Sequence, residues 1–103
     1  MPGIDYRRLR VLIPMERVLE LIGFEPTSLC GQQLRGTCLL PACQTPRMFS
    51  VNTELGLFRC FACSSQGNQL DLWSAFHDLP LHQAAQHLCQ QANLPIPWLT
   101  THR

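Results

Sequence analysis

The sequence contains no lysine, and all eight of its basic residues are arginine. Arginine is well suited to bidentate contacts with phosphate and to stacking on aromatic rings or bases. A coding bias toward G+C-rich codons explains the absence of lysine equally well. The seven acidic residues leave a formal net charge of only +1. A global electrostatic field therefore does not drive binding to nucleic acid.

Long apolar runs are also absent. No stretch approaches the roughly 20 apolar residues that a membrane span needs. The apolar patch near the N-terminus is interrupted by Glu16, Arg17 and Glu20, unlike the core of a signal peptide. We therefore expect a cytoplasmic protein without membrane contact. In that reducing compartment, six cysteines in 103 residues indicate metal binding before disulfides.

Little in the sequence indicates catalysis. The acidic residues are scattered, and none forms a pair with metal-binding spacing for phosphoryl transfer. There is no glycine-rich phosphate loop and no nucleophile motif. Glu16 and Glu20 are one helical turn apart, but a solvated helix face accounts for them. We expect a chain without enzymatic activity of its own.

A β-hairpin is predicted over residues 47–60, where the apolar pattern has a period of two. Phe49 and Val51 alternate with polar residues, and "NTELG" is a plausible turn between the two strands. Helical patterns lie on both sides of this hairpin. Apolar residues recur at three- and four-residue spacing over 14–22 and again in two segments after Asn68, a suitable helix cap.

Four cysteines form two close pairs around the predicted hairpin. "CLLPAC" carries Cys38 and Cys43, and "CFAC" carries Cys60 and Cys63. Each short loop can turn two thiolates toward one point, and the hairpin can bring the loops together, which is the arrangement of a tetrahedral zinc site. Four thiolates would leave no open position, so we predict one structural zinc ion. A redox dithiol or a disulfide framework stays open as an alternative, although neither the expected helix context nor secretion is evident.

We do not expect the remaining cysteines and the histidines to be the main metal ligands. Cys89 has the position of a buried free thiol, and Cys30 is a weak candidate for a substitute ligand. The histidines are expected to be solvated surface residues. The sequence thus predicts an α+β fold in a single domain, residues 1–103, with a small zinc ribbon flanked by an N-terminal helix and two C-terminal helices. Its expected parts are a loose basic arm (1–10), a helix (14–22), the zinc ribbon (33–66), a helical pair (68–92) and a tail (94–103).

The local charge of the ribbon differs from that of the whole chain. Between Cys30 and Asn68 there are three arginines and one glutamate, a local charge of +2. Phenylalanines are interleaved with these arginines along the predicted strands. Such a surface can hold single-stranded nucleic acid through base stacking and arginine–phosphate contacts, although the phenylalanines also fit a hydrophobic core.

The segments "RGTC" and "PRMFSVNTELGLFRCFACSSQGNQLDLW" resemble the CHC2-type zinc-binding domain of bacterial and phage DNA primases. The resemblance covers about residues 33–92 and is strongest to short, free-standing members carried on mobile elements. It implies an antiparallel zinc ribbon flanked by helices and a role in DNA binding during primer synthesis. By position it implies zinc ligation by Cys38, Cys43, Cys60 and Cys63. It also implies a DNA-contacting sheet surface, and the residues that fall on it are Arg35, Arg47, Arg59 and Phe58.

Two departures from that family pattern matter. Relatives usually have histidine as the second ligand, whereas this chain has Pro41 or nothing alignable there, so Cys43 must serve. The polymerase core of a primase is absent from these 103 residues. We expect either a separate primase or helicase subunit as partner or a binding module alone. The main hypothesis is a zinc-dependent module for single-stranded DNA, and the alternative is a zinc-stabilised protein-interaction or regulatory module.

Overall fold

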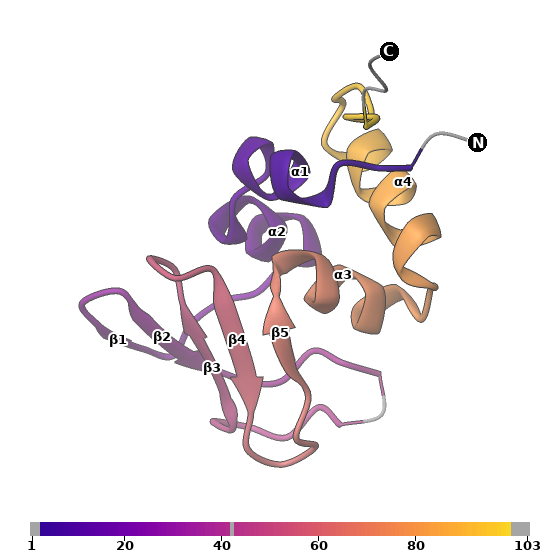
Figure 1. Cartoon of the computed structure of the whole chain (residues 1–103). Helices are drawn as coiled ribbons and strands as arrows, with labels where there is room; N and C mark the ends of the chain where they lie inside the picture. The colour runs from indigo at the N-terminus through magenta and orange to yellow at the C-terminus, as the bar shows by residue number, and fades with distance from the viewer. Residues whose placement is uncertain (1–2, 42, 100–103) are drawn as a thin grey trace.

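The computed structural model describes residues 3–41 and 43–99. Within them, four helices and a five-stranded antiparallel sheet form the α+β fold that the sequence predicts (Figure 1). The elements in chain order are α1 (Tyr6–Leu12), α2 (Met15–Ile22), β1 (Ser28–Cys30), β2 (Gln33–Gly36), β3 (Phe49–Asn52), β4 (Leu57–Cys60), β5 (Gln66–Asn68), α3 (Gln69–His77) and α4 (Leu81–Gln91). No helix in these ranges is long and apolar enough to cross a membrane.

The sheet has the strand order β1-β2-β3-β4-β5, and each strand is antiparallel to the next. The β3–β4 pair is the predicted hairpin, with Ser50 opposite Arg59. Its turn is closed by the Asn52 side chain, which accepts a hydrogen bond from the backbone N–H of Leu55 at 2.9 Å. Gly56 then takes a positive φ of 66°, a conformation that glycine adopts without steric cost.

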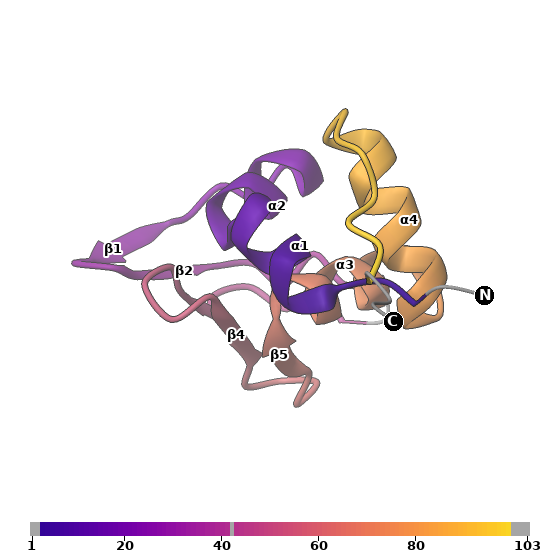
Figure 2. The same cartoon turned by 45° about the horizontal axis from the view of Figure 1, so that its top comes forward.

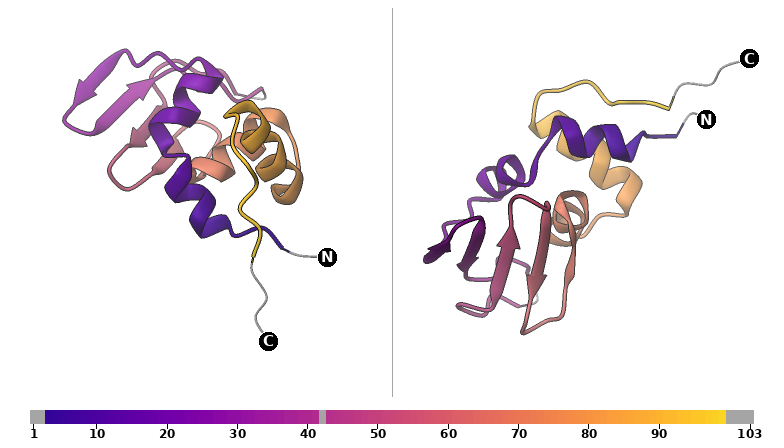
Figure 3. Two further views of the ribbon diagram at one scale, coloured as in Figure 1. Left: turned by 90° about the horizontal axis from the view of Figure 1, so that it is seen from above. Right: turned by 60° about the vertical axis from the view of Figure 1, so that its left-hand side comes forward.

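Helices cover only part of this sheet. The sheet occupies one end of an elongated molecule and α4 lies toward the other, while the β1–β2 hairpin extends away from the helices (Figures 2 and 3). The side chains of β3 and β4 alternate between a buried and a more exposed face. On the buried face Phe49 packs between Phe24 and Phe58, with ring centroids 5.3 and 5.6 Å apart. The opposite face is left open for contacts.

The N-terminal segment is helical, so the prediction of a loose basic arm over 1–10 was wrong. The Asp5 side chain caps α1 by accepting a hydrogen bond from the backbone N–H of Arg8, and Leu9 is completely buried. The buried side chain of Gln69 donates to the carbonyls of Arg10 and Ile13 at 3.0 and 3.1 Å. A contact from 56 or more residues away thus satisfies carbonyls at the end of α1, which no local pattern reveals.

The predicted tail also has regular contacts. The backbone N–H of Leu99 donates to Gly3, that of Asp5 donates to Pro97, and Ile4 forms a β-bridge with Trp98. The two ends of the described chain therefore pair with each other. The remaining parts of the predicted arm and tail, residues 1–2 and 100–103, lie outside the described residues.

The other helices follow the sequence closely. Helix α2 ends at Gly23, which has a positive φ of 77°. Asn68 caps α3 in a capping box with Asp71, and the two accept backbone hydrogen bonds reciprocally. On α4 the middle of the predicted apolar stripe, Ala84, Ala85 and Leu88, is buried, whereas Leu81 is 41% exposed; Cys89 is the expected buried thiol. Two short strands, β1 and β5, form the two edges of the sheet.

Two histidines take part in the packing of α3 on α4 and are not the solvated residues that we expected. Trp73 donates its indole N–H to Nδ1 of His87 at 3.1 Å. The ring of His77 lies 4.2 Å from that of Trp73 and 4.7 Å from that of His87, measured between centroids. The buried Nε2 atom of His77 has no hydrogen-bond partner among the described residues. Burial, with a further contribution from His87, lowers the pKa of His77 below its usual value of 6.5.

This cluster predicts a pH dependence of stability. Below about pH 6.5 the unfolded chain binds a proton at His77 more readily than the folded chain does, so the free energy of unfolding should fall as the pH decreases. The variant His77→Phe keeps a ring and removes this titration. As the pH is lowered from about 8 to about 5, we expect the free energy of unfolding of this variant to rise relative to that of the wild type in denaturant titrations. Metal loss at low pH affects both proteins, and the exposed His82→Gln variant serves as control. Parallel curves for wild type and His77→Phe would contradict the prediction.

Candidate metal centre and exposed sheet face

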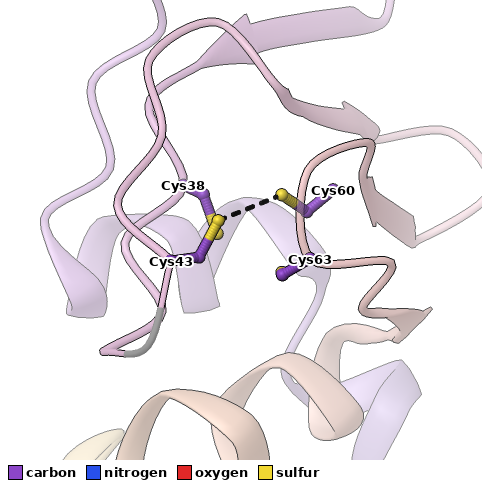
Figure 4. Close-up of side chains that lie close together, drawn as sticks. All are labelled: Cys38, Cys43, Cys60 and Cys63. Carbon is purple, nitrogen blue, oxygen red and sulfur yellow. Dashed lines mark hydrogen bonds between the residues drawn. The ribbon is translucent and has the colours of Figure 1, made fainter.

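The four cysteines of the two predicted pairs converge on one point. Their sulfur atoms all lie within 4.8 Å of one another, and Sγ of Cys43 is 3.6 Å from Sγ of Cys60. Figure 4 shows the two pairs facing each other across a gap, Cys38 with Cys43 on one loop and Cys60 with Cys63 on the other. Zinc–sulfur bonds of about 2.3 Å in a tetrahedron place sulfurs about 3.8 Å apart. The donor set therefore fits one tetrahedral metal ion.

Backbone hydrogen bonds hold each cysteine loop in place. In the first loop, which joins β2 to β3, the N–H of Cys38 donates to Thr45 at 3.1 Å, and the N–H of Cys43 donates to Leu40 at 3.0 Å. In the second loop the N–H of Cys60 donates to Ser65, and the N–H of Ser64 donates back to Cys60. Both loops are thus shaped by their own backbone, and strand pairing between β3 and β4 brings them together.

Within each loop the two thiols differ in how readily they ionise. A hydrogen bond with the Thr45 hydroxyl, 3.4 Å away, lowers the pKa of Cys43 to about 6, and Ser65 likewise lowers the pKa of Cys63. Burial raises the pKa of Cys38 to about 12, and it also raises the pKa of Cys60. One thiol of each pair is therefore easier to ionise than a free cysteine, whereas burial opposes ionisation of the other, which the charge of a metal ion would offset.

The other two cysteines lie outside this centre. Cys30 is exposed at the end of β1, so the structure does not bring this candidate substitute ligand to the cluster. Cys89 is buried in α4. With four sulfur ligands the coordination sphere is closed, which is the property of a structural site and not of a catalytic one.

The open face of the sheet carries a row of polar side chains across four strands. Arg35 on β2 pairs with Ser50 on β3, Ser50 with Arg59 on β4, and Arg59 with Gln66 on β5. Phe61, just beyond β4, is half exposed. Its ring centroid lies 5.2 Å from the guanidinium carbon of Arg35 and 5.0 Å from that of Arg59. An aromatic ring between two cations is thus presented to solvent over a hollow of about 480 Å³.

The predicted contact residues are only partly on this face. Arg35, Arg47 and Arg59 are exposed, and Arg47 lies beside Arg35 in a neighbouring hollow. In the described parts of the chain, the one ion pair joins Arg17 to Glu20, so these arginines have no carboxylate partner there.

Phe58 was wrongly predicted as a surface residue: it is 4% exposed and stacks on Phe49 in the core. The exposed aromatic residue is Phe61, which sequence reasoning did not single out. The alternation of side chains along β4 indicates both positions. Phe58 shares a face with Cys60, whose side chain must point toward the metal centre, so Arg59 and Phe61 fall on the opposite face.

This combination of a small antiparallel ribbon and four converging cysteines defines a zinc-ribbon module. Residues 20–103 match the CHC2 zinc finger family. A DNA primase of Salmonella typhimurium (strain LT2) is 29% identical over 68 residues, which are 66% of this chain and 12% of that protein. The crystal structure of the Aquifex aeolicus primase, containing zinc-binding and RNA polymerase domains, superposes with a TM-score of 0.70 at 23% identity over 98% of this chain and 23% of that one, a likeness in fold.

The chain belongs to the CHC2 zinc finger family, and the cysteine cluster is the site of its single structural zinc ion. The chain spans only a small part of the length of the primases that it matches. Zinc fits the site because it accepts four thiolates in a tetrahedron, and its positive charge offsets the cost of ionising the two buried thiols.

Loss of the metal should unfold this domain. A structural zinc ion contributes an apparent ~10 kcal/mol or more, comparable with the whole stability of a small domain. We expect Cys60→Ser, or treatment with a strong chelator, to abolish the cooperative unfolding transition followed by circular dichroism. Metal analysis should find one zinc ion per wild-type chain. Cys30→Ser is the matched control and should keep both properties. A metal-free chain that stays folded would contradict the assignment.

Proposed function

We propose that this chain is a primase-type zinc module that binds single-stranded DNA through the open face of its sheet. The observation that carries the proposal is the exposed ring of Phe61 between the guanidinium groups of Arg35 and Arg59. An exposed ring can stack on a base of any identity, and arginines beside it can contact the phosphates that flank that base. The likeness to DNA primases supports nucleic acid as the ligand.

A single strand suits this face better than a duplex. The stacking surface of Phe61 is accessible only to a base that is not already paired and stacked. Arg47 extends the row of cations past Arg35 toward β1, in a hollow that it shares with Thr27 and Ser28. The footprint therefore crosses the strands of the sheet with phosphate contacts on both sides of the stacked base.

We also propose that the module has no catalytic activity of its own. The four-cysteine centre is closed, and it is the one cluster of potential metal ligands in the described ranges. A role in primer synthesis then requires a primase catalytic domain outside these 103 residues. A cytoplasmic location and carriage on a mobile element stay predictions from the sequence.

A protein-interaction module is the second candidate. Leu55 and Leu57 are 66% and 47% exposed and line the hollow on the open face of the sheet, where they offer apolar surface to a partner. A protein partner on this side would bury these leucines. Binding to it would depend less on salt than the DNA contact does.

Substitutions on the open face test the DNA proposal. Loss of one stacking ring costs ~1–3 kcal/mol, so Phe61→Ala should weaken binding of an oligothymidine about 5- to 150-fold. Arg59→Ala should weaken it too and reduce the salt slope by about 0.7, the value for one phosphate contact on a single strand. Fluorescence anisotropy over a salt series measures both effects. Arg17→Ala, whose arginine pairs with Glu20 on α2, is the control. Equal affinities for all variants would refute the proposed face.

Primer synthesis tests the absence of catalysis. The purified chain with template, nucleotides and Mg²⁺ should make no product. Product should form only when a primase catalytic subunit is added, and Phe61→Ala should reduce the amount formed, because the module positions the template. Synthesis by the chain alone would contradict this prediction.

A further inference from the structure

A groove lies between α1 and the turn that joins β3 to β4. Its volume is about 520 Å³, and both walls carry charged and aliphatic side chains. Arg7, Arg10 and Val11 line it from α1, and Glu54, Leu55 and Leu57 line it from the turn and the start of β4. The turn is at the end of the sheet that faces the N-terminal helices (Figure 1). The metal site and the core packing make no use of the charged side chains of this groove.

The groove is continuous with the hollow on the open face of the sheet. Leu55 and Leu57 line both of them, so the two share a rim. Leu57 stands on the same face of β4 as Arg59, two residues away, and both side chains are exposed. A DNA strand that crosses the sheet and turns at Phe61 to follow β4 would therefore pass Leu57 and enter the groove at Leu55.

The charges of the groove favour an anion. Arg7 and Arg10 have no carboxylate partner among the described residues, and the single acidic side chain of the lining is Glu54 on the opposite wall. Val11 and Leu55 are 76% and 66% exposed, so the aliphatic surface between the charges is available as well. The groove thus places cations beside apolar surface, as the Arg35–Phe61–Arg59 row does, with aliphatic side chains in place of the aromatic ring.

We propose that the groove is a second phosphate-binding segment of the same single-stranded DNA site. Arg7 and Arg10 contact the phosphates of nucleotides that extend beyond the sheet, and Val11, Leu55 and Leu57 cover the sugars and bases between them. This inference rests on the proposed function. It adds that α1 belongs to the binding surface and that the site holds a longer strand than the sheet alone can contact.

The experiment compares two lengths of fluorescent oligothymidine, of about four and about twelve nucleotides, a range typical of small single-strand binding folds. The double variant Arg7→Ala/Arg10→Ala should bind the long oligonucleotide about tenfold more weakly, with its salt slope reduced by about 1.4, and should bind the short one as the wild type does. Arg8→Ala is the matched control, because it removes the same charge from α1 but does not line the groove. Zinc content and circular dichroism verify that each variant is folded.

Glu54→Gln gives an effect of opposite sign. Removal of the one carboxylate of the groove should strengthen binding of the long oligonucleotide about threefold and leave the short one unchanged. The inference is overturned if Arg7→Ala/Arg10→Ala leaves the long oligonucleotide unaffected, if both lengths lose affinity equally, or if Arg8→Ala causes the same loss. If the short oligonucleotide binds and needs Phe61 in those cases, the proposed function survives alone. Absence of binding at both lengths refutes both proposals.

Discussion

The convergence of four sulfur atoms beside the β3–β4 hairpin is the constraint on which the rest of the ribbon depends. Cys38 and Cys60 are buried, and burial opposes their ionisation. Close thiolates also repel one another, so without a cation only the pairing of β3 with β4 holds the two loops near each other. With zinc bound, the loops are tied, and β3 and β4 are fixed at the end where the metal lies. In a domain this small, the bound metal adds stability that the small hydrophobic core cannot supply alone.

The same constraint determines which side chains are offered to a ligand. The side chain of Cys60 must point inward to reach the metal, so alternation along β4 places Phe58 inside and Arg59 outside. Antiparallel register then aligns Arg59 with Ser50 and Ser50 with Arg35 across the open face. A structural metal thus orients a surface that it does not touch. This is how a closed zinc site can serve binding without any chemistry at the ion.

Local patterns predicted much of the fold, and each success has a local cause. The hairpin follows from a period of two, α3 follows from the cap at Asn68, and the metal site follows from two short cysteine spacings. The failures have distant causes. Helix α1 is stabilised from α3 by Gln69, and the C-terminal segment pairs with Ile4, contacts that cross most of the chain. The periodicity of the sequence does not predict such long-range contacts.

By itself, the sequence determined the ligands, the hairpin between them and the excess of arginine around them, because residue type and short spacing suffice for these. Only the tertiary structure decided that Phe61 lies between Arg35 and Arg59, because these arginines come from different strands. It also decided that the arginines of α1 line a groove open to the sheet. Both depend on how separate elements pack, and packing brings together side chains that lie far apart in the sequence.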